Sequence, residues 1–186
     1  MAEIITRVGP YAMQHSDPVF HNLARSITYQ QLSGKAAGTI FGRLLAAASD
    51  PLTPESVLKL RRTRMRTLGL SNQKTDYIRE LARMTRDGEV NFERCLELDD
   101  AAVIEHLTRV KGVGVWTVQM FLMFALRRLD VLPTGDLGIR MAMKKAYGLE
   151  ELPKPTEMER IAEPWRPYCT VASWYLWRSL DGQAAL

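Results

Sequence analysis

Two glycines around a single apolar residue mark the part of this sequence best suited to hold a phosphate group. Residues 107–119 read LTRVKGVGVWTVQ, so one helical segment ends, Gly112, Val113 and Gly114 follow, and another helix starts at once. Glycine permits a tight turn because it has no Cβ, and the amides at a helix start attract anions. Val113 is expected to point inward and pin the two helices together. This hairpin could bind a phosphate through backbone alone, although such a turn more often binds nothing.

A carboxylate is the second group that could do chemistry. Asp136 directly follows the turn at residues 132–135 (LPTG) and opens a predicted helix. An aspartate in this place is most often an N-cap, whose side chain accepts a hydrogen bond from the first turn. The same carboxylate could stabilise positive charge that develops on a substrate. Taken alone, its position favours the cap.

The order of these features resembles the helix-hairpin-helix (HhH-GPD) DNA glycosylase superfamily. In that superfamily the hairpin is followed by a buried helix, a Pro/Gly-containing loop and an essential aspartate. Further blocks are similar to its alkylation-repair branch, the AlkA/Mag type of 3-methyladenine DNA glycosylase. These blocks are residues 27–37 (ITYQQLSGKAA), 68–74 (LGLSNQK) and 165–168 (WRPY), the last followed by Trp177. The similarity runs in order through most of the chain, and the N-terminal β-domain of the longer AlkA type is missing.

The resemblance implies a monofunctional DNA glycosylase that flips alkylated bases out of duplex DNA and hydrolyses their N-glycosidic bond. Asp136 is then the catalytic carboxylate, which stabilises the sugar cation and orients water. Aromatic rings of the base pocket would favour a cationic base through cation–π attraction. The expected pocket residues are Trp116, Trp177, Tyr29 and Trp174, and for Trp177 a place in the core is equally expected.

The resemblance also implies where DNA is held. Gln31 aligns with the wedge that fills the gap left by the flipped base, and its alternative interpretation is a polar residue at a helix end. The other expected DNA contacts are Lys111, Gly112, Val113, Gly114, Thr117 and Lys74.

No cofactor is expected. Superfamily members that also cut the backbone carry a Schiff-base lysine where this chain has Trp116, so no lyase activity is expected. The two cysteines, Cys95 and Cys169, cannot supply the four thiolates of an iron–sulfur cluster. The three histidines show no paired metal-ligand spacing. A structural monovalent cation could bind at the hairpin.

Helix signals dominate the elements that must position these residues, and no segment alternates as a strand would. The helix from about Val115 to Arg127 is apolar nearly all round and is expected to be buried. Gly148 is suited to end the helix that Asp136 opens. Expected helix starts are Asp17–Pro18, Ser33, Thr53–Pro54, Ser71 and Asp99, and Thr156 with Glu159 has the spacing of a capping box.

These signals predict an all-α fold of nine or ten helices, arranged as two helical lobes around a DNA-binding cleft. The hairpin-bearing lobe is expected over residues 26–127, and residues 1–25 with 128–186 form the second lobe. Together they make a single glycosylase domain.

Composition excludes several classes of protein. The chain has 186 residues, 46% of them hydrophobic, and 25 Lys and Arg against 21 Asp and Glu give a net charge of +4. Its longest strongly apolar run, residues 120–126, is far shorter than the roughly 18 residues of a membrane span. Without a secretion signal, we expect a cytoplasmic monomer that acts on damaged double-stranded DNA. The alternatives are a non-catalytic hairpin DNA-binding module and a helical protein–protein adaptor.

Overall fold

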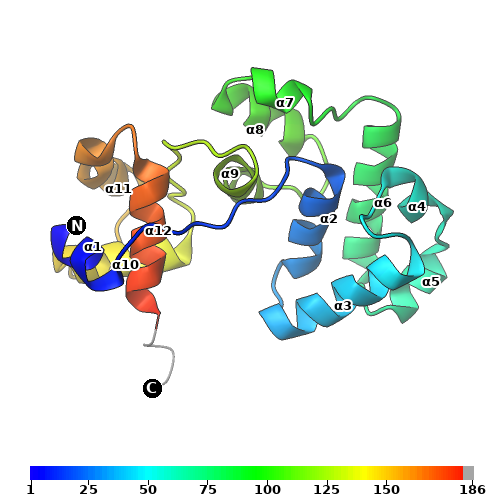
Figure 1. Ribbon diagram of the computed structural model, residues 1–186, viewed down its shortest axis with the longest axis horizontal. Helices are drawn as coiled ribbons and strands as arrows, with labels where there is room; N and C mark the ends of the chain where they lie inside the picture. The colour runs from blue at the N-terminus through cyan, green and yellow to red at the C-terminus, as the bar shows by residue number, and fades with distance from the viewer. Residues whose placement is uncertain (182–186) are drawn as a thin grey trace. The chain divides into compact units, whose positions relative to one another are not determined.

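The computed structural model describes residues 1–181, in which α-helices and one short 3-10 helix occur without any strand (Figure 1). The all-α fold class is therefore confirmed. The described residues hold more helices than expected, because short ones such as Ala2–Val8, Arg62–Thr67 and Arg94–Glu97 have too few residues to show a period. The elements are α1 (Ala2–Val8), α2 (Phe20–Tyr29), α3 (Gly34–Ala47), α4 (Pro54–Lys59), α5 (Arg62–Thr67), α6 (Asn72–Arg86), α7 (Arg94–Glu97), α8 (Asp100–Thr108), α9 (Val115–Phe124), α10 (Leu137–Tyr147), α11 (Pro155–Ala162), the 3-10 helix η1 (Glu163–Trp165) and α12 (Cys169–Leu180).

The chain divides into two compact units. The central unit is Ser16–Phe121, and the terminal unit combines Met1–His15 with Leu122–Leu186. The central unit contains α2 to α8 and most of α9, whereas the terminal unit contains α1 and α10 to α12. The central unit begins at residue 16 rather than 26 and ends at residue 121 rather than 127, so both boundaries lie earlier in the chain than expected from the sequence.

Side-chain caps fix where the helices of the central unit begin. Ser33 accepts a hydrogen bond from the Ala36 amide, and Ser71 accepts one from the Lys74 amide. Thr53 forms a capping box with Ser56. These starts are confirmed, as is the cap that Asp99 provides for α8. Helix α6 packs against α2 and α4, and its buried face carries Ile78, Leu81 and other apolar residues.

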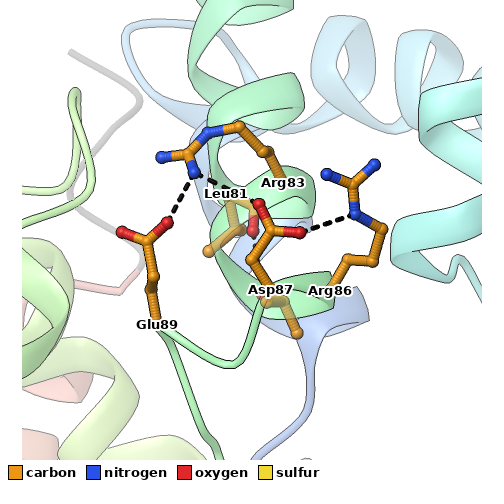
Figure 2. Close-up of polar contacts among 6 residues, drawn as sticks. Leu81, Arg83, Arg86, Asp87 and Glu89 are labelled. Atoms are coloured by element: carbon orange, nitrogen blue, oxygen red, sulfur yellow. Dashed lines mark hydrogen bonds and ion pairs between the residues drawn. The ribbon is translucent and has the colours of Figure 1, made fainter.

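The end of α6 is held by charged side chains. Figure 2 shows Arg83 reaching both Asp87 and Glu89, and Arg86 reaching Asp87. The hydrogen bond from Arg86, aided by Arg83, lowers the pKa of Asp87 below its usual value. Since exposed pairs of this kind contribute little stability, their main effect is to engage two of the chain's arginines with acids.

In the terminal unit, α12 packs against α1 and α10. Asp130 caps α12 from a distance: it accepts hydrogen bonds from the Cys169 amide at 3.3 Å and from Arg166 at 2.7 Å. The Thr170 hydroxyl accepts from the Val131 amide at 3.1 Å. These contacts fix the stretch of chain that leads to Asp136. Burial, together with Asp130, raises the pKa of the Cys169 thiol to about 12, so this cysteine is a protonated core residue.

Two predicted helix starts are wrong. Helix α2 begins at Phe20 with Val19 as its N-cap, so Asp17 and Pro18 precede it. Helix α11 begins at Pro155 after Lys154, which places Thr156 inside the first turn and excludes the predicted capping box. Gly148, by contrast, adopts the left-handed conformation and ends α10 as expected.

No helix within residues 1–181 is long and apolar enough to cross a membrane.

Candidate functional site

The glycine hairpin between α8 and α9 is a tight turn with a buried centre. The Val113 amide donates to the Val110 carbonyl at 3.0 Å, and the Val113 side chain is buried, as expected. Gly112 has a φ of +85°, and a Cβ at this position would overlap the Tyr77 ring of α6. A Cβ at Gly114 would meet no heavy atom within 4 Å. Gly112 is thus required by packing, and Gly114 leaves its surroundings open.

Exposed residues lie on both sides of this turn. Lys111 is exposed before it, and Trp116, on the first turn of α9, is 44% exposed. Helix α9 is therefore buried along its middle, at residues such as Val118 and Leu122, but its beginning is accessible. The open space beside Gly114 leaves room for an anion at the start of α9.

The end of α2 is bonded to the hairpin and to α6. Gln30 donates from Nε2 to the Gly112 carbonyl at 3.0 Å and to the Thr117 hydroxyl at 3.3 Å. The Lys74 ammonium donates to the carbonyls of Thr28 at 2.7 Å and Gln30 at 2.6 Å. Burial lowers the pKa of Lys74. Lys74 and Thr117 were expected to contact DNA, but here both side chains make internal hydrogen bonds that support α2 and the hairpin.

A pocket of about 400 Å³ opens beside this junction. Gln31 holds a φ of +56°, which is uncommon for a residue with a side chain. The Arg25 guanidinium lies 4.1 Å from the centre of the Tyr29 ring, so one face of that ring already carries a cation. The pocket is lined by Arg25, Ser26, Tyr29, Gln30, Gln31, Trp116, Thr117 and Met120. Four predicted site residues, Tyr29, Gln31, Trp116 and Thr117, thus meet in one cavity of the central unit.

The carboxylate of Asp136 lies in the terminal unit, at the start of α10. Its Oδ1 accepts from the Ile139 amide at 2.8 Å, which makes Asp136 the N-cap of the helix, and from Trp177 Nε1 at 2.9 Å. The Trp177 indole stacks on Phe124 with 6.0 Å between ring centres. Asp136 and Trp177, predicted separately, are therefore joined directly.

Trp174 is a core residue. It is 7% exposed and packs edge-on against Tyr11 and Tyr175, each with 5.0 Å between ring centres. The partners of its ring are Tyr11, Tyr175 and the Arg178 guanidinium, all in the terminal unit, and Asp136 is not among them.

Sequence reasoning missed Arg25, Gln30 and Gly138. Gln30 adjoins the predicted wedge, and Gly138 lies two residues after the predicted carboxylate, so proximity was the only available signal for either. Among residues 1–181, no group of three or more His, Cys, Asp or Glu side chains could hold a metal ion.

Comparison with known proteins agrees with this arrangement. The family model described as HhH-GPD superfamily base excision DNA repair protein matches residues 24–167. DNA-3-methyladenine glycosylase 1 of Schizosaccharomyces pombe is 34% identical over 183 residues, covering 95% of this chain and 80% of that protein.

Two solved structures are also similar. The 3-methyladenine DNA glycosylase of S. pombe in complex with abasic DNA has a TM-score of 0.85 and 33% identity over 96% of this chain and 90% of that one. A DNA-3-methyladenine glycosidase from Bacillus halodurans has a TM-score of 0.87 and 35% identity over 98% of this chain and 85% of that one. The resemblance drawn from the sequence is confirmed, and the chain belongs to the HhH-GPD superfamily of base excision DNA repair proteins.

Proposed function

We propose that this protein is a monofunctional DNA glycosylase that removes alkylated bases of the 3-methyladenine type from duplex DNA. It acts as a monomer and needs no cofactor. The observation that carries the proposal is the Asp136 carboxylate, whose Oδ1 is held by the Ile139 amide and the Trp177 indole in a chain that also contains the glycine hairpin. The named relatives and the abasic-DNA complex of the S. pombe enzyme support the choice of substrate.

Binding is assigned to the hairpin. Its backbone amides and the start of α9 favour a phosphate, so affinity would not depend on base sequence. Gln31, exposed beside the pocket, fills the space left by the extruded nucleotide. Extrusion costs a few kcal/mol, which is lower at a damaged base pair.

Hydrolysis breaks the bond between the sugar C1′ and the base nitrogen. The bonding electron pair leaves with the base, and an alkylated base that carried a positive charge departs neutral. The Asp136 carboxylate stabilises the cation that develops on the sugar. Water then forms the new C1′–O bond and releases one proton to the solvent, so the products are a free base and an abasic site.

Selectivity for cationic bases is assigned to Trp116. Cation–π attraction over an indole favours a charged base by about 0.5–2 kcal/mol. Tyr29 is a weaker candidate, because the Arg25 guanidinium 4.1 Å from its ring centre would repel a second cation on that side. An indole cannot form a Schiff base, so strand cleavage is not expected.

The test is a single-turnover assay on duplexes that each carry one lesion, with every released base identified. Asp136→Asn keeps the cap, since Asn and Asp cap equally well, but should lower the excision rate about 100-fold or more. Asp99→Asn is the matched control, because Asp99 caps α8 through the same kind of bond, 2.8 Å from Oδ1 to the Ala102 amide. An Asp136→Asn variant as fast as the parent would contradict the proposal.

The same preparations test the two alternatives. A non-catalytic hairpin module would bind duplex DNA but release no base from any lesion. DNA binding through phosphate contacts weakens steeply as salt is added. A protein–protein adaptor would show no such salt-dependent binding to DNA.

A further inference from the structure

The Trp177 indole, on α12, contacts the residue that caps the start of α10. Its Nε1–H donates to Asp136 Oδ1 at 2.9 Å, across 41 positions of sequence. The same oxygen accepts from the Ile139 amide at 2.8 Å. One carboxylate oxygen is therefore held from two directions, by the first turn of α10 and by a side chain of α12.

Helix capping does not require the second donor. Ser33, Ser71 and Asp99 each cap a helix of this chain through one backbone amide. A single bond leaves the carboxylate free to rock about its side-chain torsions, and a second donor from another helix restricts that motion. The indole nitrogen can only donate, so in this bond Trp177 is the donor and the Asp136 carboxylate is the acceptor.

The indole is itself fixed by its neighbours. One ring face stacks on Phe124, with 19° between the ring planes. Its edge lies against Gly138, where a Cβ would come within 3.2 Å of Trp177 Cδ1 and 3.1 Å of Asp136 Oδ1. Glycine at position 138 thus gives the indole room to reach the carboxylate.

We propose that Trp177 is a positioning residue, which aims the Asp136 carboxylate at the sugar of the bound nucleotide. This rests on the proposed function of Asp136. The predicted role of Trp177 as a wall of the base pocket is compatible with this one, because Asp136 engages its N–H and Phe124 only one of its two ring faces. Misplacing a reacting group by a fraction of an ångström slows a reaction without loosening binding of the substrate.

Trp177→Phe tests the proposal, because phenylalanine keeps an aromatic ring beside Phe124 and lacks the N–H donor. The single-turnover excision rate should fall about tenfold, with unchanged affinity for duplex DNA that contains a stable abasic-site analogue. In the Asp136→Asn background the same change should have no further effect on the rate. Trp165→Phe is the matched control, since Trp165 contacts Tyr147 and lies outside the proposed site.

A spectroscopic measurement reports the bond without catalysis. The four tryptophans give four indole N–H signals in a ¹⁵N–¹H correlation spectrum, and Trp177→Phe identifies the signal of Trp177. Asp136→Ala should shift that signal and speed its exchange with water, while the Trp165 signal stays in place. Gly138→Ala, whose methyl group crowds both partners, should shift it too and lower the excision rate about threefold.

Trp177→Phe that excises at the parental rate, while Asp136→Asn does not, overturns the positioning role and leaves the proposed function intact. Equal losses in rate and DNA affinity also overturn it, because they assign Trp177 to binding. If the parent releases no base, the proposed function fails. An indole signal that ignores Asp136→Ala rejects the contact itself.

Discussion

Gln31 combines a strained backbone with an exposed side chain. Its φ of +56° costs about 1–2 kcal/mol in a residue other than glycine. The Lys74 ammonium and the Gln30 side chain hold the chain just before it. Strain of this kind persists only where neighbouring contacts impose it, and the side chain so presented lines the pocket of the central unit.

Two variants of Gln31 separate strain from function. Gln31→Gly relieves the strain and Gln31→Ala keeps it, so the glycine variant should be more stable by about 1 kcal/mol in urea unfolding. Both lose the side chain that is proposed to fill the gap, and both should excise about tenfold more slowly than the parent. A glycine variant with parental activity would remove Gln31 from the reaction.

At the scale of elements, α6 supports the end of α2 and the hairpin together. Lys74 bonds to the last carbonyls of α2, and Tyr77, one turn further along, packs on Gly112. The two glycines of the hairpin therefore differ in their surroundings: Gly112 accommodates the Tyr77 ring of α6, and Gly114 has open space beside it.

Exchanging each glycine for alanine should show this difference. Gly112→Ala combines a left-handed φ with a clash against Tyr77, and should lower the free energy of unfolding by about 2–4 kcal/mol. Gly114→Ala meets no neighbour and should change stability by less than about 0.5 kcal/mol. Its methyl group would obstruct a phosphate and weaken binding to abasic-analogue DNA about tenfold. Equal stability losses in both variants would contradict this division.

Local signals predicted the elements well and failed where a neighbouring residue decided the helix start. Ser33, Thr53, Ser71 and Asp99 cap helices as expected, because a cap depends on residues three positions away. The predicted box at Thr156 and Glu159 is wrong since Pro155 fixes the first turn one residue earlier. Within the site, the hairpin and Asp136 were readable, but which indole meets Asp136 was not, because Trp174 and Trp177 share one helix and packing alone separates them.

At the scale of the whole molecule, the net charge of +4 does not show how many basic side chains are already paired within the protein. Arg62, Arg83, Arg86, Arg166 and Arg178 all form ion pairs with acids. Lys74 is bonded to backbone carbonyls. Attraction to DNA is therefore expected to depend on a subset of the basic residues, among which Lys111 is exposed next to the hairpin.

Acid should destabilise the fold partly through His106. Its Nε2 accepts from the Asn91 amide at 3.1 Å. Burial, with repulsion from Arg109 and Arg94, lowers the pKa of His106 below its ordinary value near 6.5. Above that value the histidine is neutral in both folded and unfolded chains; as the pH falls through it, the unfolded chain takes up the proton first and stability is lost.

His106→Gln keeps an acceptor for Asn91 but cannot titrate. Its melting temperature should therefore fall less than that of the parent between pH 7.5 and pH 5.5. His15→Gln, at an exposed position, is the control for removing a histidine. Parallel curves for the parent and the His106 variant would reject the assignment.

The two roles of Asp136, the observed helix cap and the proposed catalytic carboxylate, have an evolutionary consequence. Asparagine satisfies the same amide, so a descendant that carried it would fold, persist and still grip DNA while leaving every lesion in place. Selection for stability alone would not remove such an inactive variant that still binds DNA. Only selection against unrepaired DNA damage would remove it.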